Sequence, residues 1–148
     1  WPSESYAGLA RDLMARGLKV VLLGSRNDSP VTAEIAALAP GALDLAGKTR
    51  LEDAVDLIGA ARLAVSNDSG LMHVAAAVGT PIVAIYGSTS PENTPPLSET
   101  RELVWLDLPC SPCHQKICPL GHLDCLKTLE VAKVAAAAER LLAIPATA

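Results

Sequence analysis

Several features are missing from this chain, and each absence narrows what the chain can be. The 148 residues contain no Phe and only 3% aromatic residues, which disfavours the aromatic-rich strands of a β-sandwich. No apolar run approaches the roughly 20 residues that a membrane-spanning helix needs. The first residues also lack the basic and apolar regions of a secretory signal. We therefore expect a soluble, intracellular protein without a transmembrane segment.

Positive charge is also scarce. Lys and Arg number 12 against 16 Asp and Glu, so the formal net charge is −4 and the pI is about 5.3. Such a chain has no uniformly basic face to attract nucleic acid or anionic lipid. The sequence also contains neither G-x-G-x-x-G nor G-x-x-x-x-G-K-[ST], which are the dinucleotide and P-loop signatures. We therefore predict no nucleic-acid partner. We also predict neither a dinucleotide site of the G-x-G-x-x-G kind nor a P-loop nucleotide site.

Apolar residues, mainly Ala, Leu and Val, make up half of the chain, and the mean hydropathy is +0.31. This is enough for one core, so residues 1–148 are predicted to form a single domain. Short apolar runs predict buried strands at residues 19–24, 42–46, 63–66, 81–86 and 101–106. Amphipathic patterns predict helices at residues 4–16, from Ser29-Pro30 onward, from Thr49 to 61, at 71–78 and at 129–142. The alternation predicts an α/β fold with a Rossmann-like, doubly wound parallel sheet.

The loop that follows the strand at residues 63–66 carries the clearest candidate site. In open α/β sheets, ligands bind beyond the carboxyl ends of the strands, where loops lead into helices. Asp68, Ser69 and Gly70 open such a helix, with Asp68 as its expected N-cap, and its first N–H groups can hold phosphate oxygens. His73 shares that helix face and is able to donate a hydrogen bond to a pyrophosphate. Each residue also has a purely structural explanation, as a cap, a turn glycine or a half-buried helix residue.

The segment SNDSGLMHVAAAVGTPIVAIYGSTSPENTPPLS, residues 66–98, resembles the bacterial ADP-heptose:lipopolysaccharide heptosyltransferases of glycosyltransferase family 9, most closely the heptosyltransferase II branch. The shared pattern is a strand ending in N-D-S/T-G, a His soon after it, then G-T-P and a Y-G-x-T/S-x-P loop. Residues 1–13 and 22–35 are also similar to that family.

The resemblance implies the carboxyl-terminal, donor-binding half of a GT-B glycosyltransferase, which moves heptose from ADP-heptose to the lipopolysaccharide inner core. It implies that Asp68, Ser69, Gly70 and His73 surround the diphosphate and heptose, with His73 stabilising the leaving group. By the same resemblance Asp28 lies on the ribose, and Thr49 and Leu51 lie beside the adenine. Asp28 has an equally good explanation as a capping residue.

The same resemblance places the lipopolysaccharide acceptor and the catalytic base in an amino-terminal domain that this chain lacks. No residue here is then the catalytic base, no cofactor is required for the chemistry, and the isolated chain is expected to be inactive. The expected location is cytoplasmic, at the inner face of the inner membrane for the full-length enzyme. The alternatives are another GT-B transferase or sugar-nucleotide epimerase domain, or a non-catalytic nucleotide- or zinc-binding module.

All four cysteines fall in a loop expected at residues 109–127. The spacing Cys110-x2-Cys113-x4-Cys118-x6-Cys125 allows four thiolates to surround one structural zinc ion, although it is not a standard zinc-ribbon spacing. Free thiols and a pair of disulfides are the alternatives.

Overall fold

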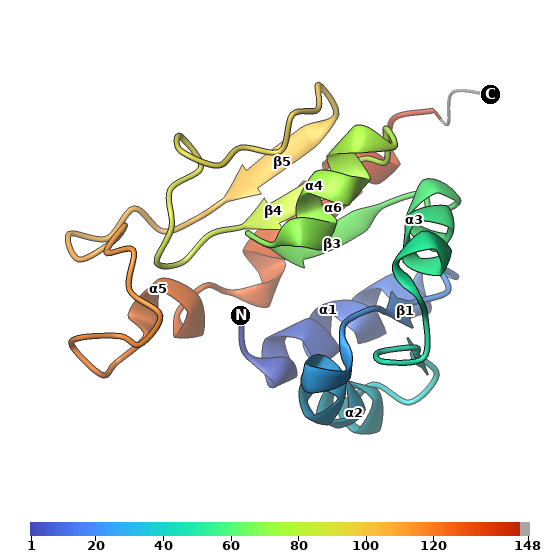
Figure 1. Cartoon of the computed structure of the whole chain (residues 1–148), viewed down its shortest axis with the longest axis horizontal. Coiled ribbons are helices and arrows are strands. Elements are labelled where there is room, and N and C mark those ends of the chain that lie inside the picture. Colours follow the sequence, from blue (N-terminus) through green and yellow to red (C-terminus); the bar gives the residue numbers. More distant parts are fainter. Residues whose placement is uncertain (146–148) are drawn as a thin grey trace. The chain divides into compact units, whose positions relative to one another are not determined.

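The structure is a computed structural model that describes residues 1–145 (Figure 1). Its residues divide into two compact units. Pro2–Asp56 form one, which we call the amino-terminal unit, and Trp1 together with the residues from Leu57 onward form the other, the carboxyl-terminal unit. The prediction of a single domain over residues 1–148 stays a prediction.

The amino-terminal unit contains two helices packed beside a short parallel ladder. Its elements are α1 (Ser3–Ala15), β1 (Val21–Leu22), the 3₁₀ turn η1 (Arg26–Asp28), α2 (Ser29–Leu38) and β2 (Leu43–Asp44), and α3 (Leu51–Gly59) begins in it. The pairing of β1 with β2 continues past the regular strands, because the Gly47 N–H donates to the Gly24 carbonyl at 2.9 Å. The core of this unit consists mainly of small side chains, with Ala7, Ala10, Ile35 and Ala39 buried.

The carboxyl-terminal unit is built around a three-stranded parallel sheet in the order β3-β4-β5. Its elements are β3 (Ala64–Asn67), α4 (Gly70–Ala77), β4 (Ile82–Ile85), β5 (Arg101–Val104), α5 (Asp124–Lys127) and α6 (Val131–Leu142). The central strand β4 is at most 1% exposed along its whole length. Figure 1 shows why: α4 covers the near face of this sheet and α6 covers the far face. Alanines on both helices let them lie close to the strands, which suits a chain without Phe.

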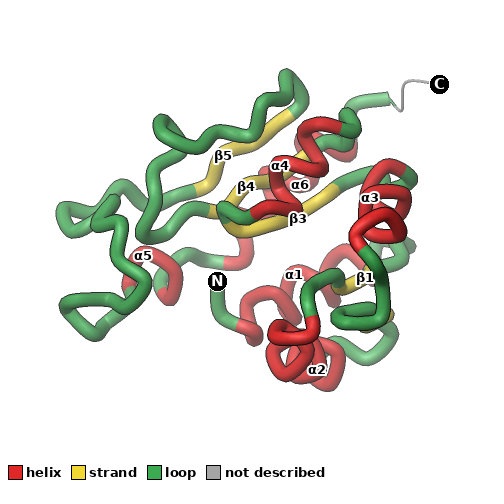
Figure 2. The backbone as a smooth tube through the Cα atoms, viewed as in Figure 1, coloured by secondary structure: helices red, strands yellow, loops and turns green. Residues whose placement is uncertain are grey.

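The predicted strands and helices are all found in the described residues, with ends that differ by a few positions. The strands are parallel, as predicted, but they form two separate sheets of two and three strands. Two long stretches, residues 86–100 and 105–123, have no regular structure (Figure 2). The prolines at 91, 95 and 96 explain the first of them, because proline lacks the N–H that a ladder or a helix needs. Within residues 1–145, no helix is both long and apolar enough to cross a membrane.

Candidate functional site

The turn between β3 and α4 presents backbone N–H groups at the carboxyl end of the sheet. The strand ends at Asn67, and α4 begins at Gly70 with Ser69 as its N-cap in extended conformation. The first N–H groups of the helix, on Gly70 and Leu71, have no carbonyl of the preceding turn to bond. They carry the positive end of the helix dipole, and this is the arrangement that binds phosphate oxygens.

The two serines of this turn bond to each other. Ser66 Oγ donates to the Asn67 carbonyl at 2.8 Å and lies 3.0 Å from Ser69 Oγ. Since a hydroxyl has a single hydrogen, Ser69 must be the donor in the serine pair. The lone pairs of Ser69 stay open, and a ligand oxygen would attract its hydrogen only by turning the hydroxyl away from Ser66.

Asp68 is held by a residue that the sequence did not single out. Its Oδ2 accepts a hydrogen bond from Thr94 Oγ1 at 2.8 Å. The prediction that Asp68 caps α4 was therefore wrong: Ser69 occupies the cap position, and the Asp68 carboxylate is directed to the loop that follows β4. Asp68 and Thr94 are 26 positions apart in an irregular region, so no periodic pattern could pair them.

Tyr86 holds the backbone of Thr94 through a hydrogen bond. The Tyr86 hydroxyl is buried next to Met72 Sδ and donates to the Thr94 carbonyl at 2.8 Å. Burial raises the pKa of Tyr86 to about 12, and the negative charge of Asp68 adds to the rise. The phenol therefore keeps its proton, and the donor bond to Thr94, throughout the neutral range. The chain Tyr86–Thr94–Asp68 connects the core to the rim of the turn.

Gly70 and His73 remain open on the surface of this turn. A Cβ placed on Gly70 would have no atom within 4 Å, and the backbone of Gly70 is not in the left-handed region. Space for a ligand rather than backbone strain is therefore what glycine provides here. His73 is exposed, one turn into α4, and within residues 1–145 its imidazole makes no hydrogen bond or ion pair.

In the amino-terminal unit, Asp28 acts as a cap. Its Oδ2 accepts from both the backbone N–H and the hydroxyl of Ser25, each at 2.7 Å, which closes the turn η1. This agrees with the capping explanation, and no bond in the described residues involves the other carboxylate oxygen. Gly24 is required beside it, because a Cβ there would lie 2.8 Å from Asp28 Cβ.

The two residues assigned to the adenine lie at the start of α3. Thr49 is half-buried, and Leu51 is 65% exposed although it is apolar. The order Thr49-Arg50-Leu51-Glu52 has the form of a capping box, but the structure does not form it, because the carboxylate of Asp53 accepts the Arg50 N–H at 2.9 Å. The Asp53 side chain also pairs with the Arg50 guanidinium at 3.2 Å, and this bond lowers the pKa of Asp53.

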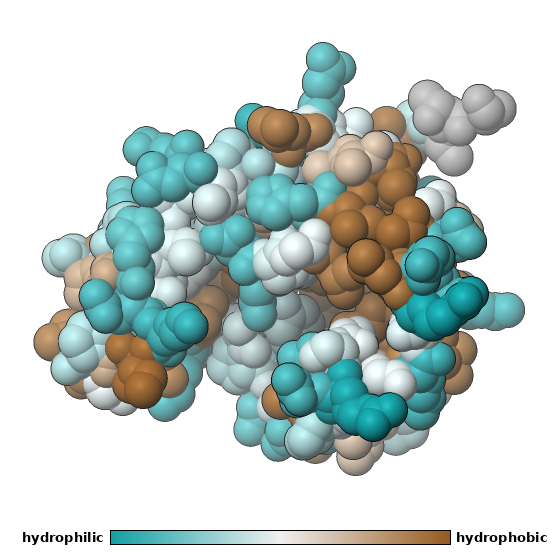
Figure 3. Space-filling model, viewed as in Figure 1, coloured by the Kyte–Doolittle hydropathy of each residue, from teal (hydrophilic) through white to brown (hydrophobic). Residues whose placement is uncertain are grey.

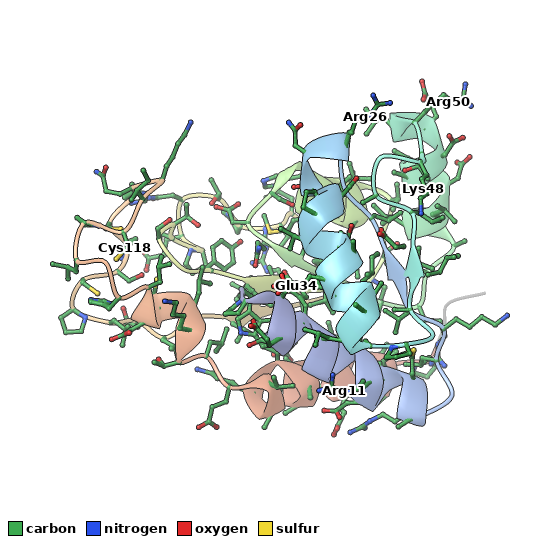
Figure 4. The ribbon with its side chains drawn as sticks, turned by 90° about the horizontal axis from the view of Figure 1, so that it is seen from below. Arg11, Arg26, Glu34, Lys48, Arg50 and Cys118 are labelled. Atoms are coloured by element: carbon green, nitrogen blue, oxygen red, sulfur yellow. The ribbon has the colours of Figure 1, made fainter. Side chains whose placement is uncertain are left out.

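Three cations follow the strands β1 and β2 of this unit, and Figure 4 shows Arg26, Lys48 and Arg50 toward the same side of the view. Lys48 donates to the Asp44 carbonyl at 2.8 Å, and Arg50 is paired with Asp53. Arg26 is close to Gly47, whose Cβ would lie 3.0 Å from the Arg26 Cα. Two of the three cations therefore already have partners within the unit.

The four cysteines are free and half-exposed, and all of them line one pocket. Backbone N–H groups of residues 120–123, led by that of Leu123, lower the pKa of Cys118. Burial raises the pKa of Cys125, and the nearby thiols of the other three add to the rise. Within residues 1–145, however, no three His, Cys, Asp or Glu side chains are placed so that they could hold a metal ion. The predicted zinc site has no support from this arrangement.

Comparison of the sequence with known proteins identifies its family. The model of glycosyltransferase family 9 (heptosyltransferase) matches residues 1–124. The chain belongs to this family. Lipooligosaccharide heptosyltransferase 2 of Haemophilus influenzae is 50% identical over 111 residues, which are 72% of this chain and 32% of that protein. Lipopolysaccharide heptosyltransferase 2 of Salmonella typhimurium is 48% identical over the same shares of the two chains.

Solved structures of this glycosyltransferase family agree. The ADP-heptose LPS heptosyltransferase II of Escherichia coli is 39% identical, with a TM-score of 0.82 over 96% of this chain and 41% of that one. A family 9 glycosyltransferase from Veillonella parvula reaches the same TM-score at 27% identity. These matches confirm the predicted α/β, Rossmann-like fold of a GT-B enzyme. The chain spans about a third of the length of the curated relatives that it matches.

Proposed function

We propose that this chain is the donor-binding part of a heptosyltransferase that moves heptose from ADP-heptose to the inner core of lipopolysaccharide. The observation that carries the proposal is the β3–α4 turn, where unbonded N–H groups, open space at Gly70 and an exposed His73 coincide in a family 9 chain. A nucleoside diphosphate sugar has the chemistry that this turn fits, because its diphosphate is an anion that needs donors.

The reaction assigns a clear task to this turn. An acceptor hydroxyl attacks the anomeric carbon, the bond from that carbon to the diphosphate oxygen breaks, and ADP leaves with added negative charge. The N–H groups of Gly70 and Leu71 are directed to where that charge develops, and His73 donates from the same helix face. Asp68, held by Thr94, sets the position of the turn and contacts the sugar. These groups stabilise the leaving group without a cofactor.

We assign the nucleoside part of ADP-heptose to residues of the amino-terminal unit. Asp28 has one carboxylate oxygen left to accept from the ribose, since Oδ2 is occupied by Ser25. Leu51 offers an exposed apolar surface to the adenine, with Thr49 beside it. These three residues come from the family resemblance, and each has a side chain that suits its role.

The other parts of the activity are assigned to residues outside this chain. The acceptor and the base that removes its proton come from the remaining two thirds of the protein, so the isolated chain transfers no heptose. The acceptor is anchored to a lipid, and the full-length enzyme works at the cytoplasmic face of the inner membrane. The family match gives no reason to prefer an epimerase or a non-catalytic module.

The decisive experiment is an ADP titration of this chain, followed by amide chemical shifts. We expect the largest shifts at Ser69, Gly70 and Leu71, with weaker binding of UDP as a matched control. Shifts confined to residues far from the β3–α4 turn would place the ligand elsewhere and refute the assignment. Unchanged spectra at millimolar ADP would refute donor binding by this chain.

A further inference from the structure

The Cys-rich loop, residues 109–127, exposes large apolar side chains to solvent and gathers its cysteines around one pocket. Three of its large apolar side chains are exposed: Ile117 by 85%, Leu120 by 62% and Leu123 by 40%. Figure 3 shows hydrophobic surface at this end of the molecule, at the lower left. The four cysteines instead share a pocket of about 110 Å³. The thiols of both halves of the loop therefore face one small cavity, which Leu120, Leu123 and Leu126 also line.

The loop is fastened to the rest of the carboxyl-terminal unit near its two ends. The His114 N–H donates to the Ser88 carbonyl at 2.7 Å, and the Ser111 hydroxyl donates to the Gly87 carbonyl. Leu126 of α5 packs on Gly87, where an added Cβ would lie 2.6 Å from the leucine. Both attachments are on the segment that follows β4. Residues 115–123 between these attachments are half-exposed or exposed, so burial contributes little to holding the loop closed and a covalent link between its halves would add to it.

Metal coordination does not fit the loop as it stands. In the part of the chain that the structure describes, no three ligand side chains are placed for a metal ion. His122 is also engaged, because its Nδ1 accepts the Asp124 N–H at 3.0 Å. The sulfur atoms still come from both halves of the loop, Cys110 and Cys113 from the first and Cys118 and Cys125 from the second, and they face one cavity. A link between two sulfurs requires only two of them to meet.

We propose that this pocket is a thiol–disulfide site, in which one cysteine of the first half forms a reversible disulfide with one cysteine of the second. The oxidant is a low-molecular-weight disulfide. A thiolate of the loop attacks it, forming a mixed disulfide and releasing one small thiol. The second cysteine, after losing its proton to solvent, attacks the mixed disulfide and releases the other small thiol. Two cysteine hydrogens and two electrons pass to the small disulfide, so the exchange is balanced.

Peptide mapping tests this on the chain as it is, without any ligand or activity. Trypsin cuts after Arg101, Lys116 and Lys127, so residues 102–116 carry Cys110 and Cys113 while residues 117–127 carry Cys118 and Cys125. After incubation with oxidised glutathione and blocking of free thiols, we expect these two peptides to be joined in most molecules. Dithiothreitol separates them again.

Two sets of variants sharpen the result. Cys110→Ser with Cys113→Ser removes both partners in the first half and abolishes the joined peptides, whereas the exposed control Ile117→Ser leaves them. The wild-type map stands even if the double variant does not fold. Glutathione adducts alone, or a disulfide confined to one peptide, would overturn the proposal. One equivalent of zinc that protects all four thiols of the reduced chain from alkylation would also overturn it.

Discussion

In both units polar turns follow the strands, but the polar groups of these turns differ in how many partners they have. In the amino-terminal unit the side chains pair locally: Asp28 with Ser25, Asp53 with Arg50, and Lys48 with a nearby carbonyl. At the β3–α4 turn of the carboxyl-terminal unit, Asp68 is held by Thr94, and Ser66 and Ser69 bond to each other. His73 and the first N–H groups of α4 are left open. The difference indicates that the first set mainly stabilises its turns and that the second is available to a ligand.

The largest test of this comparison is His73→Ala in a full-length heptosyltransferase that contains this chain. We expect the transfer rate to fall about 10- to 1,000-fold, the scale of one lost donor to a developing charge. The stability of the protein should not change, since His73 is exposed. His73→Gln keeps a donor and should recover part of the rate. An unchanged rate for His73→Ala would remove His73 from the site.

A smaller effect is expected when space is removed without disturbing the fold. Gly70→Ala places a methyl group where nothing lies within 4 Å, so the free energy of unfolding should hold or rise slightly. The same methyl group obstructs the diphosphate, and ADP affinity should fall about 10-fold, equivalent to about 1.4 kcal/mol. Gly59→Ala is the matched control, because its Cβ would make only an ordinary contact with Val78. Equal ADP affinity in both variants would mean that the ligand does not approach Gly70.

Asp28 tests whether a local cap also contacts a ligand. Asp28→Ala should lower the free energy of unfolding by about 1 kcal/mol, because the Ser25 groups lose their acceptor. Asp28→Asn keeps a capping oxygen and should restore that stability. If the ribose uses the remaining carboxylate oxygen, the Asn variant still binds ADP several-fold more weakly in calorimetry. Recovery of both properties would leave Asp28 with a capping role alone.

The smallest expected effect concerns the exposed pair of Arg50 with Asp53. The pair lowers the pKa of Asp53, so its contribution to stability is present above the ordinary value of 3.8 and is lost as pH falls through the lowered one. Solvent screening keeps that contribution small. Arg50→Ala should raise the pKa of Asp53 part of the way to its ordinary value in an NMR titration, because the backbone N–H at position 50 still donates to it, and should change ADP affinity little. A large loss of ADP affinity would show that Arg50 meets phosphate.

Local patterns in the sequence predicted most of the fold. Ile82–Ile85 is a continuous apolar run, and such a run is typical of a strand that is buried on both faces in a parallel sheet. The caps were harder, because Asp68 and Ser69, or Glu52 and Asp53, are chemically close and the choice depends on backbone angles. Thr94 could not be found at all, since its partner is set by the path of an irregular loop. The cysteines were similar: their spacing predicted that they lie close together, as the shared pocket shows, but it did not predict their arrangement in that pocket.

The buried Tyr86 hydroxyl has a practical consequence for experiments on this chain. The sequence contains only two tyrosines, and Tyr6 lacks the deep burial of Tyr86. Phenolate formation changes the near-ultraviolet absorbance, so an alkaline titration should show the Tyr86 step delayed to about pH 12. The delayed step serves as an internal optical probe of whether the core beneath the β3–α4 turn is intact. No label needs to be attached to use it.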